Sequence, residues 1–102
     1  MMYRATTPEH IWELPFSTGE IEKIEITYQQ GGKNVLTKTQ TDCALTDREI
    51  RVLLTQEETL LFATDSVEPV LVQLKVKTNG GKVWATDVYT LSVYECLNEG
   101  VM

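Results

Sequence analysis

Two six-residue segments share a Gly-Gly-Lys core, and glycine amides followed by lysine are the chemistry of a phosphate-binding loop. The segments are QQGGKN at 29–34 and TNGGKV at 78–83. A phosphate loop requires G-x-x-x-x-G-K-[ST] at the start of a helix. The residue five before the second glycine is threonine in one segment and valine in the other, and neither lysine is followed by Ser or Thr. Both segments are therefore interpreted as turns between strands.

The other chemically versatile side chains are too scattered for an active site. His10 is the sole histidine and lies near one end of the chain, where it is interpreted as a surface residue. Glu57 and Glu58 are adjacent acids, but neighbouring side chains on a helix point in different directions. Cys43, Cys96 and His10 lack the clustered spacing of a zinc site. We therefore expect no enzymatic activity, no metal and no cofactor.

Three acids surround one predicted loop and raise the question of calcium. Asp42, Asp47 and Glu49 supply the oxygen ligands that calcium prefers. The segment does not match the twelve-residue calcium loop with its glycine, so these residues are interpreted as solvated turn acids, with a calcium site as the alternative.

Charge and length limit the class of protein. The 102 residues carry a net charge of −6, with acids spread along the chain and no cluster of Lys and Arg, so neither nucleic acid nor an anionic membrane is expected as a partner. No signal peptide or membrane-spanning apolar run is recognised. The expected site of synthesis is the cytoplasm, where Cys43 and Cys96 would stay free thiols.

Apolar residues alternate with polar ones along most of the chain, which is typical of half-buried strands. A different pattern follows residue 54, where Thr55 and Glu58 form a capping box that begins a short helix. The sequence predicts one domain, residues 1–102, with an all-β, immunoglobulin-like β-sandwich of about seven strands and one short helix near 56–62. The predicted strands are 11–14, 24–28, 35–39, 42–45, 50–54, 70–77 and 82–93.

The second Gly-Gly-Lys segment predicts a hairpin register. If Asn79 and Gly80 form a two-residue loop, Val76 faces Val83, and both side chains point to the core. The same register places Leu74 opposite Ala85, and Val70 opposite Tyr89. It also places Asp87 opposite Val72 on the apolar face, which indicates a bulge, an edge or a bend at that point.

Aromatic residues supply the candidate contact surface, which comprises Trp84, Lys75 and Trp12. In the predicted register Trp84 points away from the core beside Lys75, and an exposed tryptophan on a strand is typical of a contact site. The alternative is that Trp84 covers a sheet edge or lies under the N-terminal segment. Exposed rings of this kind could also stack on sugar faces.

Five segments carry a resemblance that spans residues 8–101. They are TPEHIWELPF, IEITYQQGG, DCALTDREIRVLLTQEETLLF, VQLKVKTNGGKVWATDV and CLNEGV. Together they resemble small uncharacterised proteins encoded in prophage-like regions of Gram-positive gut bacteria, near tail and baseplate genes. A broader resemblance is to the N-terminal β-sandwich domain of phage baseplate upper proteins.

The resemblance implies a non-enzymatic structural or assembly component of a prophage tail or baseplate that acts through protein–protein contacts. Its expected partners are other phage structural proteins or further copies of itself in a homo-oligomer, and its expected destination is the virion. The alternative function is a ligand-binding module for cell-surface or cell-wall glycan that uses exposed aromatic residues.

Overall fold

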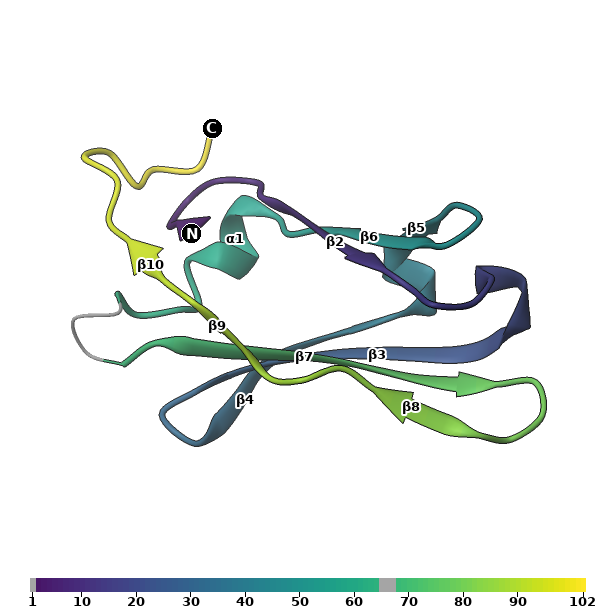
Figure 1. The fold of residues 1–102 in the computed structure, drawn as a ribbon. Helices are drawn as coiled ribbons and strands as arrows, with labels where there is room; N and C mark the ends of the chain where they lie inside the picture. The colour runs from purple at the N-terminus through teal and green to yellow at the C-terminus, as the bar shows by residue number, and fades with distance from the viewer. Residues whose placement is uncertain (1, 65–67) are drawn as a thin grey trace.

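The chain folds into an immunoglobulin-like β-sandwich of two layers (Figure 1). This computed structural model describes residues 2–64 and 68–102. The upper sheet of Figure 1 has the strand order β2-β6-β5, and the lower sheet has the order β4-β3-β7-β8, with β9 also paired to β7. The upper strands are β2 (Glu9–Glu13), β6 (Glu49–Leu53) and β5 (Cys43–Leu45). The lower strands are β4 (Lys33–Thr39), β3 (Ile21–Gln30), β7 (Val70–Thr78), β8 (Val83–Ala85) and β9 (Tyr89–Leu91).

Short elements complete the sandwich, and the N- and C-termini lie at the same end of it (Figure 1). Strand β1 (Met2–Tyr3) pairs in parallel with β10 (Val93–Tyr94). Among the described residues, no helix is long and apolar enough to cross a membrane. The elements are β1 (Met2–Tyr3), β10 (Val93–Tyr94), the 3-10 helices η1 (Thr18–Glu20) and η2 (Gln40–Asp42), and α1 (Gln56–Thr59).

The predicted fold class and each predicted strand region are confirmed, with one difference in strand count. The described residues form ten strand segments rather than about seven. The predicted strand 82–93 divides into β8, β9 and β10, and β1 was not expected. Both cysteines are free thiols, and the Cys43 Sγ donates to the Thr39 carbonyl.

The core lies between the sheets and is built from the alternate residues of their central strands. Ile24, Ile26 and Tyr28 of β3 face Ile50 and Val52 of β6 across the layer, and all five are buried. Tyr28 also packs against Phe62, with ring centroids 5.9 Å apart. Burying side chains of this size is worth about 1.5–3 kcal/mol each, so these two strands make a large contribution to the stability of the core.

The capping box predicted for the short helix is confirmed, and it also ties the two layers together. Thr55 accepts a hydrogen bond from the Glu58 amide, and the Glu58 carboxylate accepts one from the Thr55 amide. The same carboxylate lies 2.6 Å from the Lys38 Nζ of β4, whose side chain is on the inner face. After the helix, Phe62 is buried in the core, whereas Leu61 is exposed.

The two Gly-Gly-Lys segments form hairpin turns, as predicted, but the turns differ in length. In the first, Gln30 pairs with Lys33, and both Gly31 and Gly32 have positive φ, the geometry of a two-residue hairpin loop. In the second, the Thr78 amide donates to the Lys82 carbonyl, which leaves three residues in the loop. Gly81, with φ of 84°, takes the left-handed position that such a loop needs.

The extra loop residue makes the predicted register of the second hairpin wrong by one position. Val76 pairs with Trp84 rather than with Val83. A shift of one residue moves every side chain of a strand to the other face of the sheet. Val83 is consequently 58% exposed, and Trp84 packs against the core. The predicted pair of Leu74 with Ala85 is wrong for the same reason, because Ala85 pairs with Lys75.

The irregularity predicted near Asp87 is present. Strand β8 ends at Ala85, and β9 resumes at Tyr89 with Val72 as its partner. The register shifts by one more residue across this break, so Asp87 lies exposed outside the ladder. The predicted pairing of Val70 with Tyr89 is replaced by a pairing with Leu91.

The loop geometry predicts unequal responses to two neighbouring substitutions. Gly81→Ala should lower the free energy of unfolding by about 1 kcal/mol, because a Cβ is unfavourable at positive φ. Gly80→Ala should change it by less than about 0.5 kcal/mol, since Gly80 has no positive φ and an added Cβ meets only open space or ordinary contacts. Urea unfolding of both variants measures the difference. Equal losses would refute the three-residue loop.

Candidate functional site

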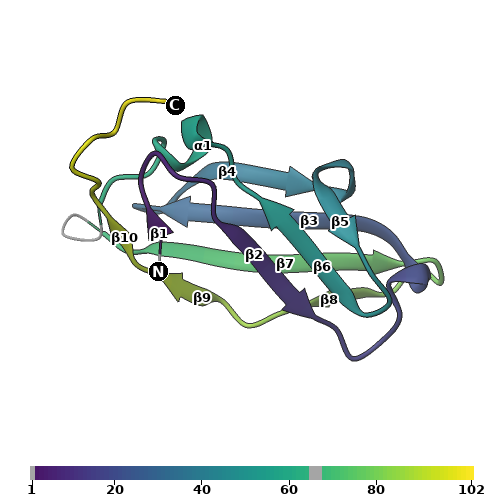
Figure 2. The same ribbon diagram turned by 90° about the horizontal axis from the view of Figure 1, so that it is seen from above.

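The terminal strands of the two sheets leave one side of the sandwich open. Strand β2 ends the upper sheet, and β8 and β9 end the lower sheet on the same side (Figure 2). A groove of about 730 Å³ separates them and is lined by all five residues of β2. The opposite wall includes Trp84, Asp87, Tyr89 and Leu91. We call this feature the open-side groove.

Among the described residues, the backbone of β2 has no hydrogen-bond partner on the groove side. The Pro8 carbonyl accepts a hydrogen bond from the Leu54 amide, and the Leu14 amide donates one to the Arg48 carbonyl. The even-numbered residues of this segment are therefore the ones that bond to β6 and its flanks. In an antiparallel pair the intervening residues turn their N–H and C=O groups the other way. Glu9, Ile11 and Glu13 therefore direct both backbone groups into the groove.

The facing edge of β8 is unpaired for the same reason. The Thr78 amide donates a hydrogen bond to the Lys82 carbonyl, and the Thr86 amide donates one to the Leu74 carbonyl. Residues 82, 84 and 86 are therefore the ones bonded to β7. Val83 and Ala85 turn their backbone groups away from β7. Two free strand edges thus flank one groove, and a free edge is a template for pairing with another chain.

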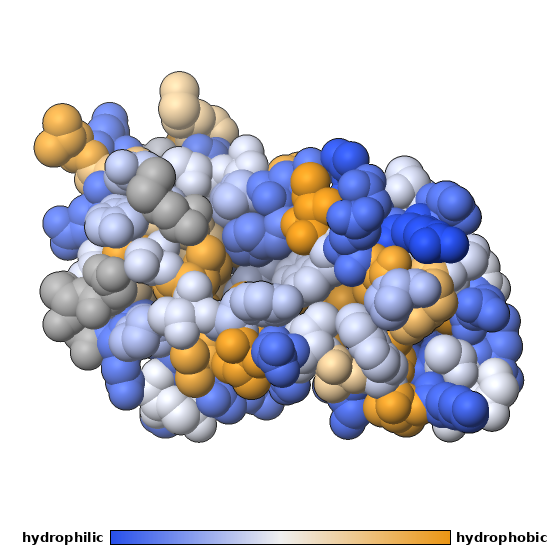
Figure 3. All heavy atoms as spheres, viewed as in Figure 1, coloured by the Kyte–Doolittle hydropathy of each residue, from blue (hydrophilic) through white to orange (hydrophobic). Residues whose placement is uncertain are grey.

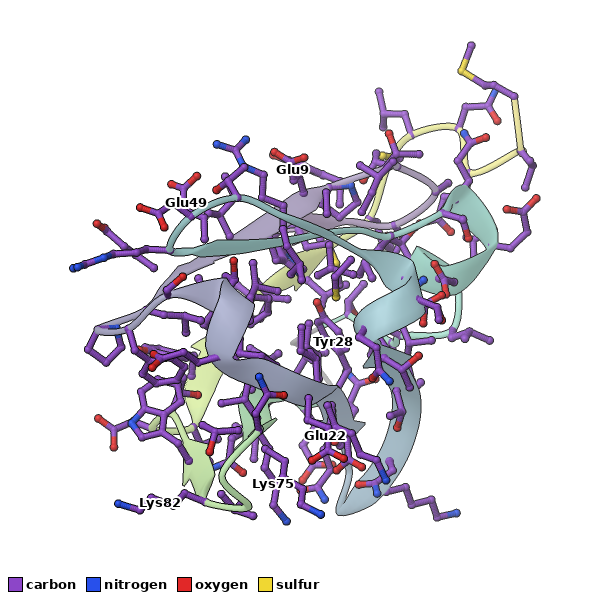
Figure 4. The ribbon with its side chains drawn as sticks, turned by 90° about the vertical axis from the view of Figure 1, so that its right-hand side faces the viewer. Glu9, Glu22, Tyr28, Glu49, Lys75 and Lys82 are labelled. Atoms are coloured by element: carbon purple, nitrogen blue, oxygen red, sulfur yellow. The ribbon has the colours of Figure 1, made fainter. Side chains whose placement is uncertain are left out.

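A hydrogen bond across the core fixes β2 beside the groove. The His10 Nδ1 lies 2.6 Å from the hydroxyl of Tyr28, which is fully buried in the lower sheet. Figure 4 shows Tyr28 between the two layers. A buried phenol hydrogen with one partner must donate to it, so the Nδ1 accepts and the imidazole proton resides on Nε2.

Burial keeps this pair neutral. Burial lowers the pKa of His10 below its ordinary value of 6.5. It also raises the pKa of Tyr28, and the nearby Cys43 and Glu58 raise it further. The His10 Nε2 is buried and has no hydrogen-bond partner among the described residues, although His10 lines the open-side groove. One buried polar atom beneath the groove wall thus has no hydrogen bond from the described residues.

Acidic side chains border the groove on both edges. Glu9 and Glu13 project from β2, and Asp87 lies in the break between β8 and β9; all three are exposed. Arg51 lies 3.4 Å from Glu9 and 3.0 Å from Glu49, so its charge is shared between those two acids. The rim of the groove is consequently acidic overall.

The structure brings two of the three predicted contact residues together. Trp12 and Trp84 line the open-side groove from opposite sheets. Trp12 is buried, with 9% of its surface exposed, whereas Trp84 is half-buried and meets the Phe16 ring edge to face, with ring centroids 5.6 Å apart. The outward orientation predicted for Trp84 is wrong, because Trp84 pairs with Val76 and packs against the core, in contact with Phe16 of the connection that follows β2. Lys75 is exposed on the outer face of the lower sheet, away from the groove (Figure 4).

Sequence analysis missed three residues of the groove. His10 was interpreted as a surface residue, but it shares the inward face of β2 with Trp12, as their alternation already indicated. Ile11 and Glu13 belong to no recognisable sequence motif. They contribute to the groove because they lie on the unpaired edge of β2. Among the described residues, no group of three or more His, Cys, Asp or Glu is placed to hold a metal ion.

Comparison with known proteins assigns the chain to no family. No family model and no curated protein sequence matches the chain. A structure of the V domain of amphioxus IgVJ-C2 is similar over 91% of this chain and 97% of that one, with 12% sequence identity and a TM-score of 0.36.

The neutral His10 predicts how stability depends on pH. Between the folded-state pKa and 6.5 the unfolded chain binds a proton at His10 that the folded chain does not, so the free energy of unfolding falls as the pH drops through 6.5. Thermal or urea unfolding between pH 7.5 and 5.5 measures this slope.

His10→Asn provides the control, because its amide oxygen can replace Nδ1 as the acceptor for Tyr28 without titrating. The variant should lose the slope near pH 6.5. It should keep the slope below pH 4.5, where Glu58 contributes: burial raises the pKa of this carboxyl, but hydrogen bonds from Lys38 and the Thr55 backbone outweigh burial and lower it. An unchanged slope near pH 6.5 in His10→Asn would contradict the neutral pair.

Proposed function

We propose that this chain is a non-enzymatic structural component that works by binding another protein through the open-side groove. The observation that carries the proposal is the pair of free strand edges, Glu9–Glu13 and Val83–Ala85, on either side of one groove. Free edges beside a groove suit backbone recognition of an extended segment. Exposed Ile11 adds an apolar contact at the middle of β2.

The arrangement favours protein over glycan as the ligand. Sugar recognition by aromatic residues needs an accessible planar face, but Trp12 is buried, and Trp84 is half-buried against the core and in edge contact with Phe16. Tyr89 is the exposed ring of the groove. Figure 3 shows apolar surface in separate patches between hydrophilic ones on this face, as expected for a contact with mixed polar and apolar character.

The resemblance to prophage-encoded proteins supplies the proposed context, a tail or baseplate. There the partner is another structural protein of the particle, and the chain reaches the virion by binding it. A ring of identical copies is the variant of this proposal in which the chain is its own partner. Light scattering of the isolated chain over a range of concentrations distinguishes the two.

Co-purification tests the proposal directly. When the tagged chain is co-expressed with the products of the genes that flank its own, we expect at least one to co-purify. Ile11→Asp should reduce its recovery at least about tenfold by placing a further charge at the centre of the edge. Leu61→Asp, at a similarly exposed position outside the groove, should leave recovery unchanged.

Two results would contradict the proposal. One is that no flanking protein binds, and the other is that Ile11→Asp and Leu61→Asp reduce recovery equally. A shift in tryptophan fluorescence with cell-wall polysaccharide, absent with an unrelated polysaccharide, would support the glycan-binding alternative through Trp84 and Trp12 instead.

A further inference from the structure

We propose that the groove recognises an extended, basic segment of the partner, which adds to the free edge of β2 as an antiparallel strand. This inference rests on the proposed function and specifies the chemistry of the partner. Strand β2 has five residues, and three of them present both backbone groups to the groove. A partner strand of five residues, roughly 17 Å long, would cover this edge completely.

The charges of β2 disfavour a second copy of the same strand. Two β2 strands paired antiparallel about Ile11 would place Glu9 of one copy opposite Glu13 of the other, at both ends of the pair. Like charges directly opposite one another destabilise a strand pair, and charged edges are a common protection against self-pairing. The acidic side chains of β2 thus disfavour pairing with β2 of a second copy and allow pairing with a strand of opposite charge.

The same acids define what the partner must carry. Glu9, Glu13 and Asp87 border the groove, and among the described residues only Arg51 forms an ion pair with any of them. Lysine or arginine opposite Glu9 and Glu13 would form two cross-strand ion pairs on the outer face. These partner residues are four apart, with an apolar residue opposite Ile11 between them.

The alternate positions of the partner strand point into the groove. The position opposite Trp12 faces Trp84 and Leu91 and therefore suits an apolar side chain. The position opposite His10 lies beside the imidazole, whose buried Nε2–H has no acceptor among the described residues, and a small side chain with a hydroxyl or amide group suits this polar neighbourhood. In chain order the segment reads basic, apolar, apolar, Thr or Asn, basic, for example Lys-Leu-Val-Thr-Lys.

Peptide titration tests this inference. The probes are the capped peptides Ser-Lys-Leu-Val-Thr-Lys-Ser and Ser-Glu-Leu-Val-Thr-Glu-Ser, titrated into the intact chain at low ionic strength with NMR detection of backbone amides. We expect the basic peptide to bind at least about tenfold more tightly and to protect the amides of Glu9, Ile11 and Glu13 from exchange. Raising the salt concentration should weaken this preference.

Matched charge reversals distinguish the effect of the charges at the groove from the effect of the overall net charge. The double variant Glu9→Lys, Glu13→Lys should reverse the peptide preference. The double variant Glu22→Lys, Glu57→Lys changes net charge equally at exposed positions outside the groove, and should keep the original preference within about twofold.

Three results would overturn the inference: equal affinity for both peptides, the same reversal in the control variant, or no protection of β2 by the basic peptide. Equal affinity with protection of β2 would leave protein binding at the groove intact and remove only the basic partner. Failure of the proposed function itself appears separately, as loss of the Ile11-dependent co-purification.

Discussion

The hydrogen bond between Tyr28 and His10 is the interaction on which the arrangement of the open side depends. It joins the centre of the lower sheet to the terminal strand of the upper sheet at 2.6 Å. Among the described strands, β2 is hydrogen-bonded only to β6, and the His10–Tyr28 bond and the packing of Trp12 attach the inner face of β2 to the core. Because β2 is fixed in this way, its outer N–H and C=O groups stay directed into the groove, and the separation between β2 and the strands β8 and β9 is maintained.

The second constraint is the length of one turn. The three-residue loop that ends with Gly81 brings Trp84 against Phe16 and turns the backbone groups of Val83 and Ala85 away from β7, where Ala85 lines the groove. A two-residue loop would have exchanged the two faces of β8, with Trp84 outside and Val83 in the core. Turn geometry therefore determines which residues of the lower sheet border the site.

Much of the fold follows from local sequence patterns, and the site follows from them only in part. Alternation predicted the strands around Ile24, Val52 and Val72, and the Thr55–Glu58 capping box predicted α1, because these signals depend on near neighbours in the chain. The register of β8 was missed because Asn-Gly-Gly is compatible with loops of two or three residues. The role of His10 was missed because its partner, Tyr28, lies on a different sheet, and the free edge of β2 depends on strand order, which one sequence does not reveal.

Amide hydrogen exchange of the isolated chain, resolved by residue, tests the open edge most directly. The account predicts rapid exchange at Ile11, Glu13, Val83 and Ala85, and slow exchange at the intervening Trp12, Leu14 and Trp84, whose amides bond to the adjoining strands. An alternating pattern on both strands would establish that the two edges are free. Uniform protection along β2 would show that this edge is already paired, and would contradict the assignment of the groove as a binding site.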